Sequence, residues 1–190
     1  MKRRLAVVSV LVLGLLGLVT ATALSPAGAA TRSTSPVITI SGSSVVGSST
    51  LTRTRMSVSF ALRTTGLEGG HAVTVWWMVF NHPQYCTDTC DMDDLSNPEV
   101  DASVLYAAGT VVGASGRLNL AGALRVGDAD GALAGMGTGT GLQNPAGAAV
   151  YLVVRDHGPA DPAIVEEQIH TFHVCNPTCT DLQISMHQPS

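Results

Sequence analysis

Lysine is almost absent from this chain. Beyond Lys2 the sequence contains none, which excludes phosphate-binding P-loops and Schiff-base catalysis, because both depend on a lysine amine. Positive charge in general is scarce. After residue 29, seven arginines stand against 14 carboxylates, which gives a formal net charge of −7. Nucleic acids and anionic membranes attract proteins through basic patches, so we expect neither as a partner.

After its first thirty residues the chain also lacks long apolar runs and any clear helical period. The start of the chain is different. Lys2 and two arginines come first, an uncharged stretch covers residues 5–30, and its most apolar part is residues 6–19. Ala27 and Ala29 provide the small residues of a cleavage site. A basic start, a short apolar run and small residues in this order are typical of a secretory signal peptide.

We therefore predict a signal peptide over residues 1–29, with cleavage after Ala29 or, as the alternative, after Ala30. An uncleaved membrane anchor is the other interpretation, because the uncharged run approaches the roughly 20 residues of a bilayer span. Thr20 and Pro26 dilute the second half of the run, which favours cleavage. The mature protein is then expected to be secreted and extracellular, without stable membrane insertion.

Several short segments have the apolar pattern of strands. Every second residue of 56–63 is apolar, which is the period of a strand with one buried face. Residues 71–80 are apolar on both faces and predict a central strand covered on both sides. Further strands are predicted at residues 102–113, 117–127, 148–156, 164–174 and 181–187. Short strands separated by turns predict an all-β fold, an antiparallel β-sandwich of immunoglobulin-like or jelly-roll-like type.

The segment before these strands has a different composition. Residues 30–54 are rich in Ser, Thr and Gly, so we expect a tail or weak edge strands there. Residues 55–190 are expected to form a single β-sandwich domain. The 161 residues that follow residue 29 are enough for one domain with a core of its own.

Three phrases stand out beside the two cysteine pairs: VWWMVFNHP, ASVLYAAGTVVG and VYLVVRDHGPA. Together with those pairs, they resemble an uncharacterised group of secreted bacterial all-β proteins. The resemblance covers roughly residues 56–187 and implies secretion and an all-β body. It implies no activity, and no functional residue is carried over from it.

The four cysteines form two C-x3-C units, Cys86 with Cys90 and Cys175 with Cys179. An even count in an exported protein indicates disulfides, and three pairings are open. Turn-forming residues lie inside both units and favour local pairing, because a disulfide needs its Cα atoms close together. On the chain-entropy model a local bridge contributes about 2 kcal/mol, whereas cross-pairing would close loops of about 90 residues and contribute about 4–5 kcal/mol. We predict the local pairing.

Carboxylates crowd the first cysteine unit and the residues after it. The candidate metal ligands there are Asp88, Asp91, Asp93 and Asp94. Calcium prefers carboxylate and carbonyl oxygens, so a calcium site is the alternative to a solvated acidic loop without a cofactor. Neither this segment nor the one containing Asp128 and Asp130 has the spacing of an EF-hand.

Cysteine together with histidine or methionine would suit zinc or copper(I). The side chains available for this are His82, Met92, His173 and His187. Catalytic motifs are missing from the sequence. GMGTGTG lacks the spacing of a phosphate-binding loop, and no G-x-S-x-G turn accompanies His157. An enzyme is therefore not the preferred interpretation.

Trp76 and Trp77 are adjacent, so in a strand they face opposite sides. One is expected in the core. The other is either covered by a second layer or exposed as a stacking platform for a ligand, so both are stacking candidates. Taken together, the sequence predicts a secreted, non-catalytic binding or structural module. The alternative is an extracellular metal-binding protein, with calcium in the acidic loop or with copper or zinc held by Cys and His.

Overall fold

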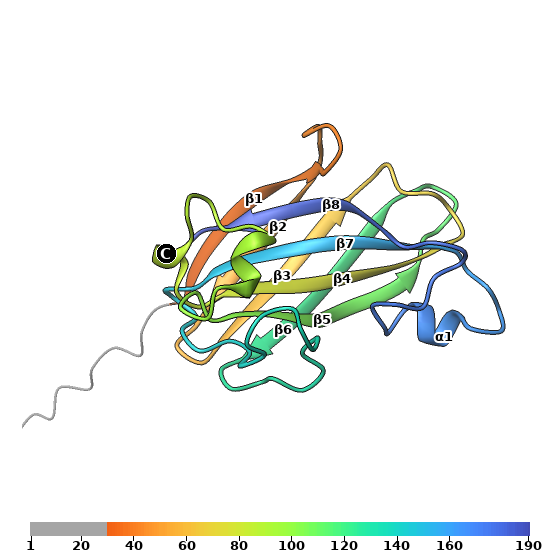
Figure 1. Cartoon of the computed structure of the whole chain (residues 1–190). Coiled ribbons are helices and arrows are strands. Elements are labelled where there is room, and N and C mark those ends of the chain that lie inside the picture. Colours follow the sequence, from red (N-terminus) through yellow and green to blue (C-terminus); the bar gives the residue numbers. More distant parts are fainter. Residues whose placement is uncertain (1–29) are drawn as a thin grey trace, which may run out of the picture.

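The computed structural model describes residues 30–190, so the signal peptide predicted over residues 1–29 lies outside the described residues (Figure 1). Eight antiparallel strands form one sheet in the order β5-β4-β7-β8-β1-β2-β3-β6. The strands are β1 (Thr31–Thr39), β2 (Val45–Arg53), β3 (Ser57–Thr64), β4 (His71–Phe80), β5 (Ala102–Val111), β6 (Leu118–Arg125), β7 (Ala149–Pro159) and β8 (Thr180–His187). The antiparallel all-β fold predicted from the sequence is confirmed.

Helical structure is limited to short turns. They are η1 (Pro83–Tyr85), η2 (Asp93–Ser96) and α1 (Val165–Gln168). Within residues 30–190 no helix has the length and apolar character to cross a membrane.

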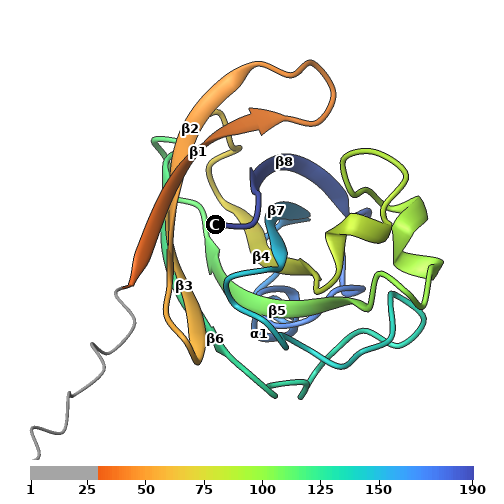
Figure 2. The same cartoon turned by 90° about the vertical axis from the view of Figure 1, so that its left-hand side faces the viewer.

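The sheet curls until its two edge strands, β5 and β6, approach each other (Figure 2). A Cβ atom on Gly122 of β6 would lie 3.2 Å from the carbonyl oxygen of Ala107 in β5 and 2.7 Å from the ring of Phe60. Glycine therefore permits the close approach of the two edges. The result is a nearly closed sandwich with two halves. We call β5-β4-β7-β8 the covered half and β1-β2-β3-β6 the open half.

The space between the two halves is filled by the main hydrophobic core. β4 points Val73, Val75, Trp77 and Val79 into this interior, as the sequence pattern predicted. Trp77 meets Phe60 of β3 edge-on, with ring centroids 4.9 Å apart. Aromatic pairs prefer this geometry, because the positive edge of one ring meets the negative face of the other.

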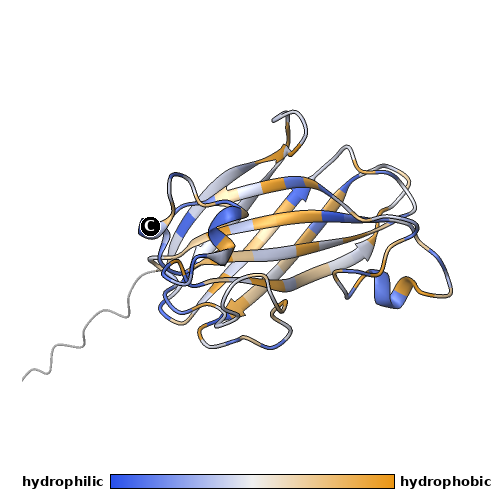
Figure 3. Cartoon of the chain, viewed as in Figure 1, coloured by the Kyte–Doolittle hydropathy of each residue, from blue (hydrophilic) through white to orange (hydrophobic). Residues whose placement is uncertain are grey.

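A second hydrophobic core lies on the outer face of the covered half. Its strand residues are Trp76, Met78, Phe80, Val104, Tyr151 and Val153. Three loops, residues 81–101, 127–147 and 160–179, supply the covering side chains, among them Leu95, Met136 and Phe172. Figure 2 shows the first two loops outside this half, and Figure 3 shows hydrophobic residues along β7, with hydrophilic ones in the loop 81–101. Strands β4 and β7 of the covered half are therefore apolar on both faces.

Two expectations about the elements were wrong. Residues 30–54 are neither a tail nor edge strands, because β1 and β2 lie inside the sheet with partners on both sides. Val37 and Leu51 anchor them in the core with no exposure. The segment 164–174, predicted as a strand, contains α1 and turns.

Candidate functional site: a methionine-lined pocket

A pocket of about 350 Å³ opens on the outer face of the covered half, beside the turn that joins β1 to β2. This size lies within the range of roughly 300–1,000 Å³ that is usual for small-molecule sites. The lining residues are Ile38, Thr39, Ile40, Ser43, Trp76, Met78, Cys90, Asp91, Met92, Val104, Met136, Tyr151, Val153, Phe172, Asp181, Ile184 and Met186. Four of the chain's five methionines after Met1 are among them, which gives the pocket a flexible and polarisable wall.

Three neighbouring strands form the floor of the pocket, each through the residues that point outward. Register places Trp76 of β4 opposite Val153 of β7, and Val153 opposite Ile184 of β8. One step along the strands, Met78, Tyr151 and Met186 form a second row across the same three strands. Since side chains two residues apart share a face, the two rows make one continuous apolar surface.

β8 has an unusual orientation. Its apolar residues Ile184 and Met186 point outward to the pocket, while its polar residues Gln183, Ser185 and His187 are buried on the inner side, each 2% exposed or less. Burying polar groups costs free energy unless they form hydrogen bonds. The apolar face of β8 is thus directed away from the main core and towards the pocket.

The buried polar residues of β8 are hydrogen-bonded to the open half, Gln183 to Thr64 and Thr65 at the end of β3, and Ser185 and His187 to β1 and β2. Ser49 of β2 hydrogen-bonds Ser185 at 2.6 Å and the Nε2 atom of His187 at 2.7 Å, and Ser33 of β1 hydrogen-bonds Nδ1 of His187 at 2.9 Å. Burial lowers the pKa of His187 to about 4, and the charge of Arg53 acts in the same direction. The sequence does not predict this network, because its serines lie in the segment 30–54, for which a tail or weak edge strands are predicted.

Arg53 closes the same end of the sandwich. Its guanidinium group donates to the carbonyl oxygens of Pro145, Ala148 and Gln188, which ties the C-terminal residues to the loop before β7. Burial lowers the pKa of Arg53, because the surroundings solvate its charge less well than water does.

Both disulfides have the local pairing predicted from the turn residues. Cys86 is bonded to Cys90 with Cα atoms 5.1 Å apart, and Cys175 to Cys179 with Cα atoms 5.3 Å apart. Cys90 is buried in the second core and lines the pocket. The first bridge therefore fixes the wall that carries Asp91 and Met92.

The four candidate calcium ligands do not converge. The Asp94 carboxylate accepts the backbone N–H of Asp91 at 2.9 Å, and the Asp91 carboxylate accepts the backbone N–H of Asp93 at 2.8 Å. Asp88 and Asp93 are exposed. Two of the carboxylates thus shape the turn around η2, and the calcium site stays a prediction without support from their geometry.

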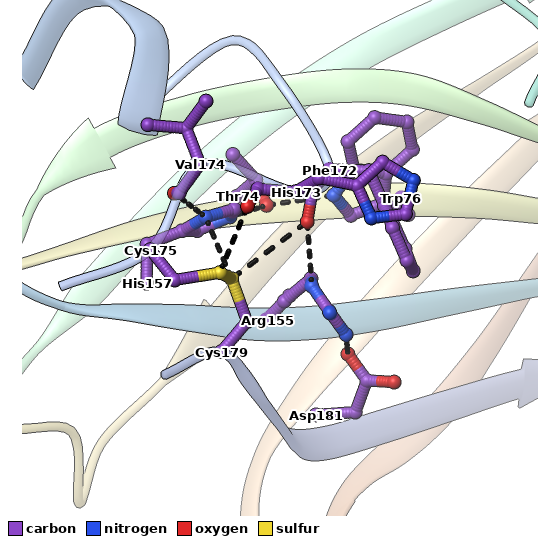
Figure 4. A network of polar contacts seen from close by, with 10 residues as sticks. All are labelled: Thr74, Trp76, Arg155, His157, Phe172, His173, Val174, Cys175, Cys179 and Asp181. Atoms are coloured by element: carbon purple, nitrogen blue, oxygen red, sulfur yellow. Dashed lines mark hydrogen bonds and ion pairs between the residues drawn. A yellow bond between two sulfur atoms is a disulfide. The ribbon is translucent and has the colours of Figure 1, made fainter. Parts of the chain in front are cut away.

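The second disulfide lies beside a buried histidine (Figure 4). His157 has no exposed surface, and its Nδ1 atom faces the carbonyl oxygen of Val174 at 2.8 Å. A carbonyl only accepts, so Nδ1 carries the proton and Nε2 is the acceptor. The Thr74 hydroxyl then donates to Nε2 at 2.7 Å, and the Trp76 indole N–H donates to the Thr74 oxygen at 2.7 Å. Burial lowers the pKa of His157, which favours this neutral form.

Arg155 packs on the ring of Phe172 (Figure 4), and Phe172 lines the pocket. Its guanidinium carbon lies 3.9 Å from the centre of the Phe172 ring, and its Nε donates to the Phe172 carbonyl oxygen at 3.0 Å. Its NH1 atom donates to the Asp181 carboxylate at 2.6 Å. Phe172 in turn meets Trp76 edge-on at 5.0 Å, so this wall is fixed from both sides.

Neither tryptophan is an exposed platform. Trp76 is 2% exposed and Trp77 is 1% exposed, because the loops cover the outer face and the open half covers the inner one. Of the two alternatives for the outward tryptophan, cover by a second layer is confirmed and the exposed stacking platform is wrong. Trp76 alone of the two lines the pocket, through its outward orientation on β4.

Two carboxylates act on Tyr151, which lines the pocket. Burial raises the pKa of Tyr151, and the charges of Asp94 and Asp91 raise it further, against a hydrogen bond from Gln188 that lowers it. A negative potential at the tyrosine hydroxyl has this sign, because it disfavours the phenolate.

Two groups of possible metal ligands occur within residues 30–190. His157 lies with Cys175 and Cys179, and Asp94 lies with Cys86 and Cys90, with the ligand atoms of each group within 4.8 Å of one another. In both groups the two sulfur atoms are bonded to each other, which leaves no thiolate for a metal. His82, His173 and His187 join neither group.

Comparisons with known proteins give little further information. No protein-family model matches the chain, and no curated protein matches it. Among solved structures, the chain is similar to a crystal structure of a mutant of an SOD-like protein from Bacillus subtilis, at 10% identity and a TM-score of 0.36, over 83% of this chain and 97% of that chain. Similarity at this level identifies no shared site, and the resemblance to secreted bacterial proteins stays a prediction.

Proposed function

We propose that the protein is a secreted, non-catalytic binding module that takes up a small apolar molecule in the methionine-lined pocket. The observation that carries this proposal is the orientation of β8, which directs Ile184 and Met186 outward to the pocket while its polar residues are buried. An apolar surface that is directed away from the main core suits a ligand that covers it. The Ser49–His187 pair lies on the inner side of β8, away from the pocket, with both residues almost fully buried.

A fluorescence titration tests the binding. The neutral dye phenylnaphthylamine should bind saturably and quench Trp76, which lines the pocket. Met186→Gln should weaken binding about tenfold, because the polar amide removes apolar contact that contributes about 1–2 kcal/mol to binding. Met56→Gln is the matched control, since Met56 is 65% exposed and does not line the pocket. Equal binding by the two variants, or no saturable binding by the unaltered protein, contradicts the proposal.

The disulfides and the lack of a membrane-crossing helix within residues 30–190 are compatible with secretion. Cleavage after Ala29 leaves β1 whole, because that strand begins at Thr31. N-terminal sequencing of the exported protein should therefore start at Ala30. A membrane-held form that begins at Met1 would contradict secretion.

Metal binding is the second candidate function, favoured by the group of His157 with Cys175 and Cys179. Two thiolates and an imidazole suit zinc or copper(I), once a thiol reductant has opened the disulfide. Metal analysis after equilibration with zinc, with and without reductant, tests this candidate. Zinc bound by the reduced protein and lost in Cys175→Ser supports it, whereas equal zinc contents contradict it.

A further inference from the structure

The charged residues that line the pocket are all acidic. Its lining includes two carboxylates, Asp91 and Asp181, and no arginine, lysine or histidine. Asp181 is paired with Arg155 at 2.6 Å, so its charge is largely compensated. Asp91 belongs to no ion pair among the described residues. One uncompensated negative charge therefore borders an otherwise apolar cavity.

Asp91 is placed to meet a ligand. It follows Cys90 directly, so the disulfide to Cys86 limits the movement of its backbone. Among the hydrogen bonds of residues 30–190, its carboxylate accepts one, from the backbone N–H of Asp93 through Oδ1. The other oxygen remains open, and the residue is exposed at the pocket.

The surroundings of Asp91 also favour a cation. Asp94 lies next to it, and both carboxylates raise the pKa of Tyr151, whose ring lines the same cavity. Aromatic faces attract cations. One such contact already exists in this wall, because the guanidinium group of Arg155 lies 3.9 Å from the centre of the Phe172 ring. An anionic ligand would instead meet Asp91 without any lining cation to neutralise it.

We propose that the ligand of this pocket is a cationic amphiphile, whose apolar body lies on the methionine-lined floor and whose ammonium group pairs with Asp91. This inference rests on the proposed binding function and adds the charge of the ligand. The floor formed by Met78, Ile184 and Met186 takes the apolar part. Asp91 is exposed, so solvent screens this ion pair and its contribution to binding is modest.

Three probes with the same apolar chain test the charge: octylammonium, octanol and octanoate. Each is titrated at pH 7 and one ionic strength, by displacement of phenylnaphthylamine. Octylammonium should bind up to about fivefold more tightly than octanol, and octanoate most weakly, because the exposed charge of Asp91 is negative. Added salt should reduce the preference for octylammonium, since the carboxylate of Asp91 is exposed to solvent.

Paired variants assign the preference to one side chain. Asp91→Asn retains an oxygen that can accept the Asp93 N–H but loses the charge, and it should reduce the preference for octylammonium to about twofold. Asp88→Asn makes the same change of net charge on an exposed residue that does not line the pocket, and it should keep the full preference.

The outcomes separate the two proposals. Equal displacement by octylammonium and octanol, stronger displacement by octanoate, or an unchanged preference in Asp91→Asn would overturn the inference about charge while the binding function stands. If the dye binds and none of the three probes displaces it, the inference falls. If the dye itself does not bind saturably, the proposed function falls as well.

Discussion

The two halves of the sandwich use their strands differently. In β3, on the open half, residues 57–64 alternate between buried and exposed, because one face packs on the core and the other meets water. In β4, on the covered half, every residue from Ala72 to Phe80 is buried. The difference lies in the three loops that cover β4 from outside. Loops of this molecule therefore form a structural layer, and the pocket lies where that layer meets β8.

The largest expected effect tests whether the outer layer is a true core. Met78→Ala removes a side chain that is 5% exposed on the outer face of β4, and it should lower the free energy of unfolding by about 2–5 kcal/mol. Met56→Ala makes the same change at a residue that is 65% exposed beside β3, and it should alter stability by less than about 0.5 kcal/mol. Urea unfolding measures both. Similar small effects would show that the loops do not seal the outer face.

The next effect concerns the contact between the halves, where His187 of β8 meets the serines of β1 and β2. The pKa of His187 is about 4 in the folded protein and near 6.5 when unfolded. Between these pH values the unfolded state binds the extra proton, so stability falls as pH decreases from 6.5 to 4. The loss from this group should be about 3 kcal/mol, and His157, whose pKa is also lowered, adds to it in the same direction.

Urea unfolding at pH 7 and at pH 4 measures this loss. His187→Gln removes the titrating group, so its stability should depend less on pH than that of the unaltered protein by about 3 kcal/mol over the same interval. The carboxylates titrate in both proteins and cancel in the comparison. Parallel pH profiles of the two proteins would show that folding does not lower the pKa of His187.

The sequence predicts the two halves unequally. The alternation of residues 56–63 and the apolar run of 71–80 predict β3 and β4 with the correct faces, since burial on one or two sides leaves a direct trace in the pattern. β1 and β2 leave little trace, because their inner positions include Ser33 and Ser49, which are satisfied by a partner more than a hundred residues away. Propensity cannot show such a distant hydrogen bond.

The pocket was the least predictable feature. The pattern of residues 181–187 predicts a strand with one polar and one apolar face, but alternation does not tell which face points inward. The usual rule would bury Ile184 and Met186 in the main core, and the structure does the reverse. The local disulfides were predictable, because turn residues within each unit are a short-range signal. The convergence of four methionines from distant segments is a product of the tertiary fold.

The two disulfides should stabilise the covered half of the sandwich and leave the open half unaffected. Replacing Cys86 and Cys90 by serine should lower the free energy of unfolding by about 2 kcal/mol, because a small closed loop is released in the unfolded chain. Hydrogen exchange should rise in residues 81–101, which cover β4, and stay unchanged in β3 of the open half. The Cys175→Ser, Cys179→Ser double variant is the matched control, with faster exchange expected in residues 160–179. An equal rise in β3 would mean that the loops are coupled to the whole sandwich.

The smallest effect concerns the glycine-rich loop of residues 127–147. Of the three loops that cover β4, it is the one without a disulfide. Its hydroxyl groups on Thr138 and Thr140 donate to the Asp101 carboxylate at 2.5 and 2.8 Å, and Asn81 donates to the other carboxylate oxygen at 3.2 Å. Asp101 has a positive φ of 52°, which asparagine also tolerates, so Asp101→Asn tests the hydrogen bonds without adding backbone strain.

Asp101→Asn should lower the free energy of unfolding by about 1 kcal/mol, because the amide replaces one accepting oxygen by a donor that faces Asn81. Asp130→Asn, at an exposed position of the same loop, should change stability by less than about 0.5 kcal/mol. Urea unfolding compares the two variants. If they are equally stable, Asp101 does not anchor the loop, and the outer layer is held by its apolar contacts and disulfides alone.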